Sequence, residues 1–202
     1  MKRPPYKLIS LLLQYPEDRL LVARPQLAAA LGALPRSAER SALEEFWKFY
    51  SEAHATRLQQ EYVETFDLQR RSSLYLTFYS EGDTRKRGQS LLRLKRMYAA
   101  AGLELEGREL PDYLPVILEF AELAPDGVGQ RLLAEHRAGL EILRLHLLEL
   151  HSPYRHLIAA ICADLPKLGP LGSATVAQLL KTGPPAEQVG LEPFAPPEVI
   201  PR

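Results

Sequence analysis

The chain has 202 residues, of which 46% are hydrophobic and 25% charged, and its 25 basic and 25 acidic residues give a formal net charge of zero. This length and composition indicate one globular domain and exclude a fibrous chain. A neutral chain has no overall attraction for nucleic acid or for an anionic membrane, so charged recognition must come from local patches.

The N-terminal part of the chain predicts two helices. Apolar residues at helical spacing favour a first helix over 6–14, which ends before Pro16. Its apolar stretch, 8–13, is too short to span a bilayer and is followed by no small-residue cleavage site, so we expect a cytosolic protein. A second helix over 18–31 must kink or restart at Pro25, because proline lacks the N–H that a helix interior needs.

The next segments carry most of the aromatic residues. Ser41 and Glu44 have the spacing of a capping box, which predicts that a helix opens there. Apolar residues three or four positions apart predict a further helix over 59–67. The segment 72–79 is predicted as a short helix, although its run of apolar residues also fits a strand.

Turn residues divide the central part of the chain. Thr84 follows a Gly-Asp turn and is expected to cap a helix that runs to Ala101, where Gly102 ends it. Pro111 is expected to open the next helix, since proline is tolerated in a first turn. The strongest helical periodicity spans 130–150, where leucines form one apolar stripe.

The C-terminal part predicts a core helix over 154–165 and a short helix over 174–180. From Gly183 onward the chain contains six prolines, which predict a disordered or extended tail. The sequence therefore predicts an all-α fold. We expect a single helical-bundle-like domain of roughly eight or nine helices over 1–182, followed by a proline-rich tail over 183–202.

Common motifs of catalysis and of metal binding are missing from the sequence. The five histidines lack metal-ligand spacing, and the single cysteine, Cys162, permits no disulfide and argues against a zinc or iron–sulfur site. No nucleophile elbow, P-loop or dinucleotide fingerprint occurs. We therefore expect no catalytic residue, no metal and no cofactor. A small helical enzyme stays open as an alternative, and it would need a pocket with perturbed titrating groups.

Charge is segregated between two neighbouring segments. Between 70 and 96 there are eight basic residues against two acidic ones, whereas 39–67 has seven acidic residues against three basic ones. A nucleic-acid-binding helical regulator that uses the basic 85–96 stretch is one interpretation, although no recognisable binding module accompanies it. Solvated helix faces and a dipolar surface for a protein partner are the others.

Aromatic residues and charges alternate most densely between 61 and 88. Five aromatic residues lie there close to carboxylates and guanidinium groups. This mixture suits a groove that takes an amphipathic peptide helix, because aromatic rings contact apolar anchors while charges fix the orientation. Core aromatics with surface ion pairs would give the same pattern, so the residues by themselves leave both interpretations open.

The same segments carry a family resemblance. The characteristic runs are Tyr-Val-Glu-Thr-Phe-Asp-Leu at 62–68, Arg-Arg at 70–71, Gly-Asp-Thr-Arg-Lys-Arg-Gly at 82–88 and Glu-Leu-Pro-Asp-Tyr-Leu-Pro at 109–115. With these runs the chain resembles the respiratory nitrate reductase delta subunits, which are NarJ-type assembly chaperones for molybdenum enzymes. The resemblance covers roughly residues 6 to 165, and the tail takes no part in it.

This resemblance implies a cytosolic, all-α, non-enzymatic chaperone. Its partner would be the catalytic alpha subunit of a respiratory nitrate reductase, bound through the N-terminus of that subunit. The chaperone would keep the apo-enzyme competent for insertion of the molybdopterin guanine dinucleotide cofactor and would delay membrane docking. We expect a monomer or weak homodimer that neither binds nucleic acid nor inserts stably into a membrane.

The resemblance also implies where the partner peptide binds. In the wider family a Tyr-x-x-x-Phe element and an acidic Pro-Asp element are associated with peptide recognition, and here they fall at Tyr62, Phe66 and 109–112. Where relatives have Glu-Pro-Asp-His this chain has Glu-Leu-Pro-Asp-Tyr, which argues against carrying over a nucleotide-binding role. The expected partner-binding residues are Glu61, Tyr62, Glu64, Phe66, Asp67, Arg70, Arg71, Tyr75, Tyr79, Asp83, Arg85, Arg87, Glu109, Pro111, Asp112 and Tyr113.

Overall fold

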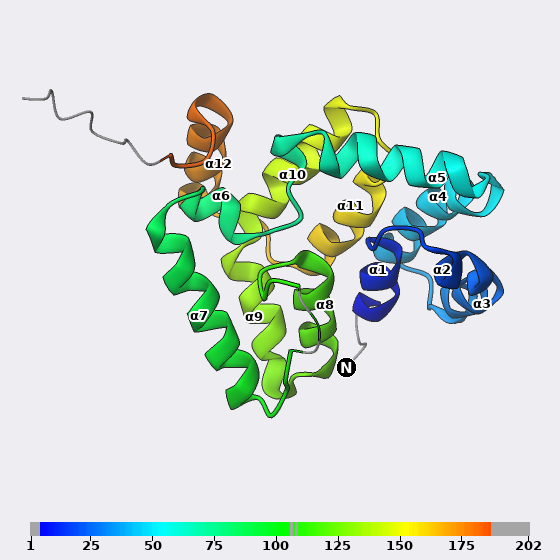
Figure 1. Ribbon diagram of the computed structural model, residues 1–202, viewed down its shortest axis with the longest axis horizontal. Coiled ribbons are helices and arrows are strands. Elements are labelled where there is room, and N and C mark those ends of the chain that lie inside the picture. Colours follow the sequence, from blue (N-terminus) through cyan, green and yellow to red (C-terminus); the bar gives the residue numbers. More distant parts are fainter. Residues whose placement is uncertain (1–4, 106, 108, 187–202) are drawn as a thin grey trace, which may run out of the picture.

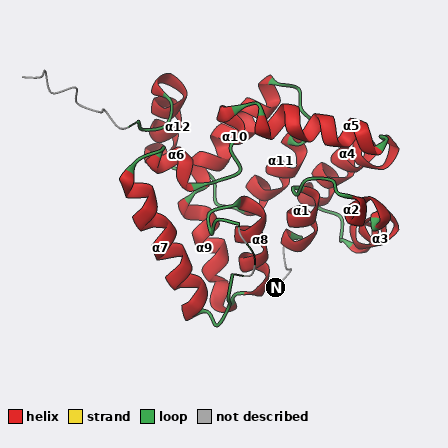
Figure 2. Cartoon of the chain, in the orientation of Figure 1, coloured by secondary structure: helices red, strands yellow, loops and turns green. Residues whose placement is uncertain are grey.

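The computed structural model describes residues 5–105, 107 and 109–186, and within these residues the fold is built of helices (Figures 1 and 2). They form twelve α-helices, one π-helical segment and two 3-10 turns, with no β-strand in the described ranges beyond an isolated bridge between Tyr75 and Tyr113. The predicted all-α class is therefore confirmed.

The helices follow one another with short connections, except for the longer segment 101–113 between α7 and α8. Their bounds are α1 Tyr6–Leu12, α2 Asp18–Val22, α3 Arg24–Ala33, α4 Ala38–Glu52, α5 Ala55–Tyr62, η1 (π) Val63–Asp67, η2 (3-10) Arg70–Ser72, α6 Thr77–Glu81, α7 Arg85–Ala100, α8 Leu114–Leu123, η3 (3-10) Pro125–Gly127, α9 Val128–Glu135, α10 Arg137–Glu149, α11 Arg155–Asp164 and α12 Pro170–Thr182.

The count of twelve α-helices exceeds the predicted eight or nine because long periodic segments are divided. The helix expected over 18–31 restarts next to Pro25, whose missing N–H falls harmlessly in the first turn of α3. The helix expected over 130–150 breaks at His136, where ψ is 12° and the backbone leaves the α conformation. The restart was predicted from Pro25 itself, whereas apolar periodicity continues through the break at His136 and conceals it.

Two predicted helix starts are wrong. The N-cap of α4 is Ser37, whose Oγ accepts a hydrogen bond from the Arg40 backbone N–H at 3.2 Å, so Ser41 lies inside the helix. Pro111 lies within the turn that precedes α8, and Pro115 is the proline that occupies the first turn of α8.

The packing places α11 at the centre of the molecule. It contacts α4 on one side and α10 on the other, while α1 packs on α8, α8 on α9, and α12 on α10 (Figure 1). Helices α8 and α9 approach so closely that a Cβ added to Gly129 would lie 2.2 Å from the Cα of Ala121. Large buried aromatic side chains fill the centre, among them Tyr6, Phe46 and Tyr154.

The C-terminal helix α12 is longer than the segment 174–180 predicted from the sequence. Most of the predicted proline-rich tail, residues 187–202, lies outside the described residues. The four tail residues that are described turn back onto the domain, since a Cβ added to Gly82 would lie 1.7 Å from the Pro185 carbonyl oxygen. None of the described helices combines the length and the hydrophobicity that crossing a bilayer requires.

Candidate partner-binding groove

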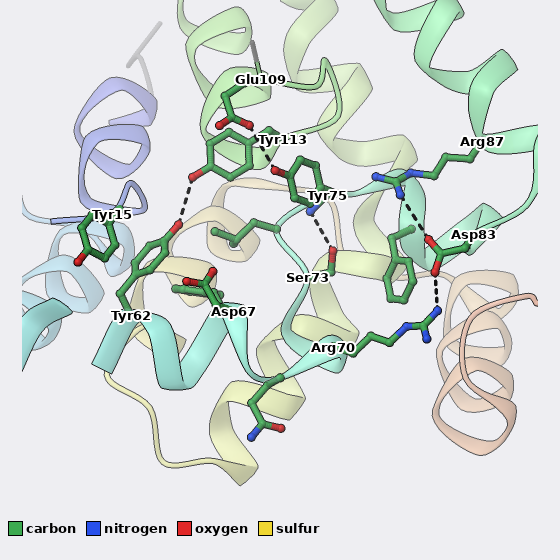
Figure 3. Close-up of a pocket in the computed structure, with 14 residues that line it drawn as sticks. Tyr15, Tyr62, Asp67, Arg70, Ser73, Tyr75, Asp83, Arg87, Glu109 and Tyr113 are labelled. Atoms are coloured by element: carbon green, nitrogen blue, oxygen red, sulfur yellow. Dashed lines mark hydrogen bonds and ion pairs between the residues drawn. The ribbon is translucent and has the colours of Figure 1, made fainter. Parts of the chain in front are cut away.

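A cavity of about 540 Å³ opens where Tyr15, the stretch 62–87 and the stretch 109–113 meet (Figure 3). We call it the aromatic groove. Its lining consists of Tyr15, Tyr62, Phe66, Asp67, Gln69, Arg70, Ser73, Leu74, Tyr75, Phe78, Asp83, Arg87, Glu109 and Tyr113.

One wall of the groove is a cluster of aromatic rings. The ring of Tyr62 lies 4.9 Å from that of Phe66 and 5.4 Å from that of Tyr15, and Phe66 rests on the buried Tyr154 at 4.8 Å. Residues 63–67 are π-helical, with the Leu68 N–H donating to the Val63 carbonyl at 3.0 Å. This wider turn ends in the groove wall, and such π-bulges occur frequently at functional sites.

A short antiparallel clamp holds the second aromatic pair. The Leu76 N–H donates to the Asp112 carbonyl at 2.9 Å, and the Leu114 N–H donates to the Leu74 carbonyl at 2.7 Å. These bonds set the rings of Tyr75 and Tyr113 5.4 Å apart. The segment predicted as a helix over 72–79 is therefore extended in its first half, and only Thr77–Glu81 is α-helical.

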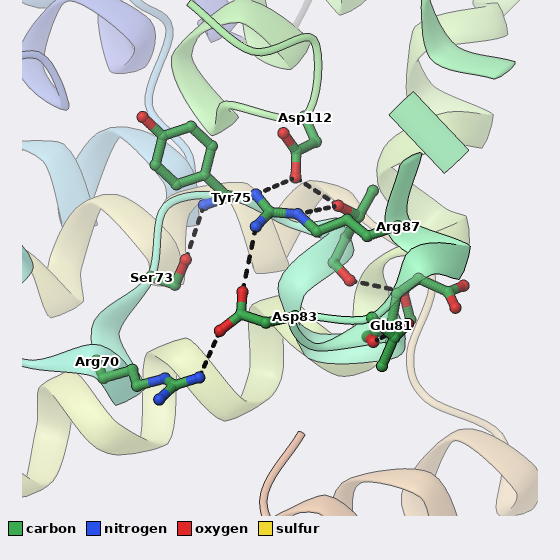
Figure 4. Close-up of polar contacts among 10 residues, drawn as sticks. Arg70, Ser73, Tyr75, Glu81, Asp83, Arg87 and Asp112 are labelled. Carbon is green, nitrogen blue, oxygen red and sulfur yellow. Dashed lines mark hydrogen bonds and ion pairs between the residues drawn. The ribbon is translucent and has the colours of Figure 1, made fainter. Parts of the chain in front are cut away.

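A chain of charges forms the opposite wall (Figure 4). Asp112 is fully buried, accepts a hydrogen bond from the Thr77 hydroxyl at 2.5 Å and pairs with Arg87 at 3.3 Å. Arg87 also pairs with Asp83 at 3.5 Å, and Asp83 in turn pairs with Arg70. The two guanidinium groups lie over aromatic rings of the groove, at 5.7 Å from Tyr75 and 5.6 Å from Phe78. The wall is thus tied to the core through one buried carboxylate.

Two carboxylates in the groove lining have no cationic partner in the described part of the chain. Among the described residues, Asp67 and Glu109 form no ion pair, and both are exposed. Glu109 accepts a hydrogen bond from the Tyr75 hydroxyl at 3.3 Å. Burial, together with the charge of Glu109, raises the pKa of Tyr75 to about 12, so the phenol stays protonated at neutral pH. The lining therefore offers aromatic contact area with two uncompensated negative charges.

The structure brings nine of the sixteen expected residues into this lining. They are Tyr62, Phe66, Asp67, Arg70, Tyr75, Asp83, Arg87, Glu109 and Tyr113. Of the others, Pro111 and Asp112 are buried beneath the groove, and Tyr79 is buried against α10, where a Cβ added to Gly139 would lie 3.0 Å from the Tyr79 Cβ. Glu61 faces the connection between α10 and α11, where its carboxylate accepts a hydrogen bond from the Ser152 hydroxyl at 3.1 Å. The remaining three, Glu64, Arg71 and Arg85, are exposed outside the lining.

Five lining residues were not among the expected ones: Tyr15, Gln69, Ser73, Leu74 and Phe78. Four of them lie inside the aromatic and charged run at 61–88, so the whole run was a better guide than single motif positions. Tyr15 comes from the connection after α1 and reaches Tyr62 only through the tertiary fold. Its sequence signal is the leucine-rich run 11–16, which ends in Tyr-Pro and belongs to the family resemblance but is weak by itself.

The described residues offer little for catalysis or metal binding. In the described part of the chain, no three His, Cys, Asp or Glu side chains are grouped as a metal site would require. Cys162 is half-buried on α11, and burial raises the pKa of its thiol to about 11. A thiol that stays protonated at neutral pH is a poor nucleophile. The groove is thus the feature of this molecule best suited to binding.

Comparison with known proteins gives the family. Residues 26–160 match the nitrate reductase delta subunit family. The chain is 29% identical to a probable nitrate reductase molybdenum cofactor assembly chaperone NarJ of Bacillus subtilis, with 81% of this chain and 89% of that protein aligned. It is 32% identical to the NarJ chaperone of Escherichia coli K12, over 73% of this chain and 63% of that one.

A longer relative shares the same region. The chain is 36% identical to the nitrate reductase-like protein NarX of Mycobacterium tuberculosis, over 80% of its own length but only 24% of that protein. The matched stretch therefore occurs both in a protein of similar size and as part of a larger one. The match over 26–160, which includes all of the groove except Tyr15, means that this chain belongs to the nitrate reductase delta subunit family.

Proposed function

We propose that this protein is an assembly chaperone for a respiratory nitrate reductase. It binds the N-terminus of the apo catalytic subunit in the aromatic groove and keeps that subunit competent for molybdenum cofactor insertion and membrane docking. Relatives named as nitrate reductase molybdenum cofactor assembly chaperones support the general role. The observation that carries the finer proposal is the groove itself.

The chemistry of the lining matches an amphipathic peptide with basic residues. Tyr15, Tyr75 and Tyr113 present partly exposed rings, which supply large contact area at a low entropic cost. Asp67 and Glu109 lack a cation of the described chain and so can receive Lys or Arg side chains of the peptide. Exposed aromatic anchors bordered by free carboxylates are what such a ligand requires.

Calorimetric titration with a synthetic peptide of the catalytic subunit's N-terminus tests this proposal. Replacing an anchor, as in Tyr15→Ala or Tyr75→Ala, should weaken binding by about tenfold or more, because buried aromatic anchors dominate most interfaces. Asp67→Asn or Glu109→Gln should cost less and should mainly reduce the salt dependence. Phe66→Ala should also exceed the carboxylate variants in effect.

The buried rings need separate treatment. Tyr62 is only 6% exposed and its hydroxyl lies 3.2 Å from that of Tyr113, so Tyr62→Phe is the usable variant at that position. Trp47→Ala, which truncates a half-buried ring of α4 outside the groove, is the matched control. A melting curve for each variant separates loss of binding from loss of fold. Folded groove variants that bind the peptide as tightly as Trp47→Ala would overturn the proposal.

A further inference from the structure

Helix α7 carries an unusual concentration of positive charge. Its 16 residues include six Lys or Arg and no acidic residue. One of the six, Arg87, turns inward to Asp112. The other five are exposed and define what we call the basic face of α7: Arg85, Lys86, Arg93, Lys95 and Arg96.

The basic face follows from the helical repeat. Leu94 and Tyr98 are buried and hold α7 to the domain, with the Tyr98 ring 4.4 Å from that of Phe120 in α8. The cations lie away from this buried side and extend over roughly 16 Å, given the 1.5 Å rise per residue. Leu92, 49% exposed, lies among them. Figure 1 shows α7 along an outer edge of the molecule, where an extended planar surface can contact it.

Three of these cations have no ion-pair partner in the described part of the chain. Arg93 pairs with Glu135 of α9 at 2.6 Å. Among the described residues, no carboxylate lies within ion-pairing distance of Lys86, Lys95 or Arg96. Because the chain as a whole is neutral, this concentration is a local feature with acidic residues placed elsewhere. A single-sign patch of this kind favours an anionic partner.

We propose that the basic face of α7 docks this protein reversibly on an anionic lipid surface. The face carries two lysines but no aromatic residue, whereas protein interfaces are depleted in Lys and enriched in aromatics. Lysines and arginines around one exposed leucine suit a headgroup layer, where cations meet lipid phosphates and the leucine reaches the acyl boundary. The apolar side of α7 stays in the core, so binding is electrostatic and superficial.

Nucleic acid fits the face less well. Sequence-specific readers place a helix in a groove with hydrogen-bonding side chains aimed at base edges, and the centre of this face holds Leu92. The lipid proposal does not depend on the function proposed for the aromatic groove, because the two sites share no residue. The two proposals can therefore fail separately.

Cosedimentation of the full chain with vesicles tests this inference. Vesicles of phosphatidylcholine with about one third phosphatidylglycerol should retain the protein at low salt, and pure phosphatidylcholine should not. Binding should disappear at about 1 M salt, where the Debye length is only about 3 Å. The triple variant Lys86→Gln, Lys95→Gln, Arg96→Gln should lower the partition coefficient roughly a hundredfold, at about fivefold per cation.

The matched control removes the same number of positive charges from positions outside α7. It is the triple variant Arg36→Gln, Lys167→Gln, Lys181→Gln, which removes three exposed cations outside α7 and should keep vesicle binding within about twofold. Both triple variants should have the melting temperature of the parent protein and should bind the groove peptide with the parent's affinity. Absence of binding to anionic vesicles, or equal loss in both triple variants, would overturn the inference. Retention of duplex DNA without vesicle binding would overturn it in favour of a nucleic-acid surface.

Discussion

Asp112 shapes the groove from below without lining it. Its carboxylate fixes Thr77 and Arg87, and its backbone carbonyl fixes Leu76, so α6, α7 and the segment before α8 meet at this one residue. Asp112 was expected to bind the partner peptide because the family resemblance associates an acidic Pro-Asp element with peptide recognition. Sequence could place the residue near the site but could not tell an inward-facing carboxylate from an outward-facing one.

We expect Asp112→Asn to lower the free energy of unfolding by about 3 kcal/mol, because it leaves the half-buried Arg87 without its buried counter-charge. Asp83→Asn is the comparison, since the Asp83 side chain is 57% exposed and surface pairs contribute about 1 kcal/mol or less. Denaturant titration measures both. Similar losses for the two variants would show that burial of Asp112 confers no special role.

His146 gives the molecule a predicted pH dependence. It is buried on α10, neither ring nitrogen makes a hydrogen bond in the described structure, and Glu149 approaches Nδ1 at 3.6 Å. Burial, with a smaller contribution from the Arg71 cation, lowers the pKa of His146 below 6.5. The unfolded chain thus takes up this proton at a higher pH than the folded chain does.

The sign of the effect follows from that difference. The stability that neutral His146 confers is complete above about pH 6.5 and is lost as the pH falls through the lower folded-state pKa. Melting temperature should therefore fall less steeply between pH 7 and pH 5 in His146→Leu than in the parent. His54→Gln, at an exposed position, should keep the parent's slope. An identical slope in all three proteins would refute the assignment to His146.

At the scale of elements, the sequence predicted helix type well and helix boundaries less well. Leucine periodicity located the α8 to α11 region, and Gly102, with φ at +75°, ends α7 as predicted. The restart next to Pro25 was predicted, whereas the break at His136 and the π turn over 63–67 were missed, because both preserve the apolar spacing on which prediction depends. The π turn is also the feature that places Phe66 in the groove wall.

Alanine substitutions at two helical glycines should have opposite effects on the stability of the fold. Gly129→Ala should destabilise the fold by about 2 kcal/mol or more, since a Cβ there would overlap Ala121 where α8 crosses α9. Gly88→Ala should stabilise it by up to about 1 kcal/mol, because nothing lies within 4 Å of the added methyl group and glycine disfavours a helix interior. Thermal melts of the two variants decide. A destabilised Gly88→Ala would indicate a backbone contact that the packing of α7 does not explain.

At the scale of the whole molecule, the groove is assembled from separate regions of the chain. The connection after α1, the end of α5 with η1, the 69–87 segment and the residues before α8 each contribute to its lining (Figure 3). Family motifs identified the last three, since they are contiguous runs of unusual residues. Tyr15 escaped prediction because only the packing of α1 brings it to Tyr62. The sequence thus predicted most of the lining residues, but not that Tyr15 completes the lining beside Tyr62.

Site-specific photo-cross-linking tests the central claim most directly. A benzophenone side chain would replace Tyr15, Tyr75 or the control Leu171, which is 87% exposed on α12 outside the groove. After irradiation with the apo catalytic subunit of the nitrate reductase, mass spectrometry identifies the joined peptides. We predict that positions 15 and 75 both join to the N-terminal segment of that subunit and that position 171 does not. Cross-links from 15 and 75 to other regions, or equal yields at all three positions, would contradict the account.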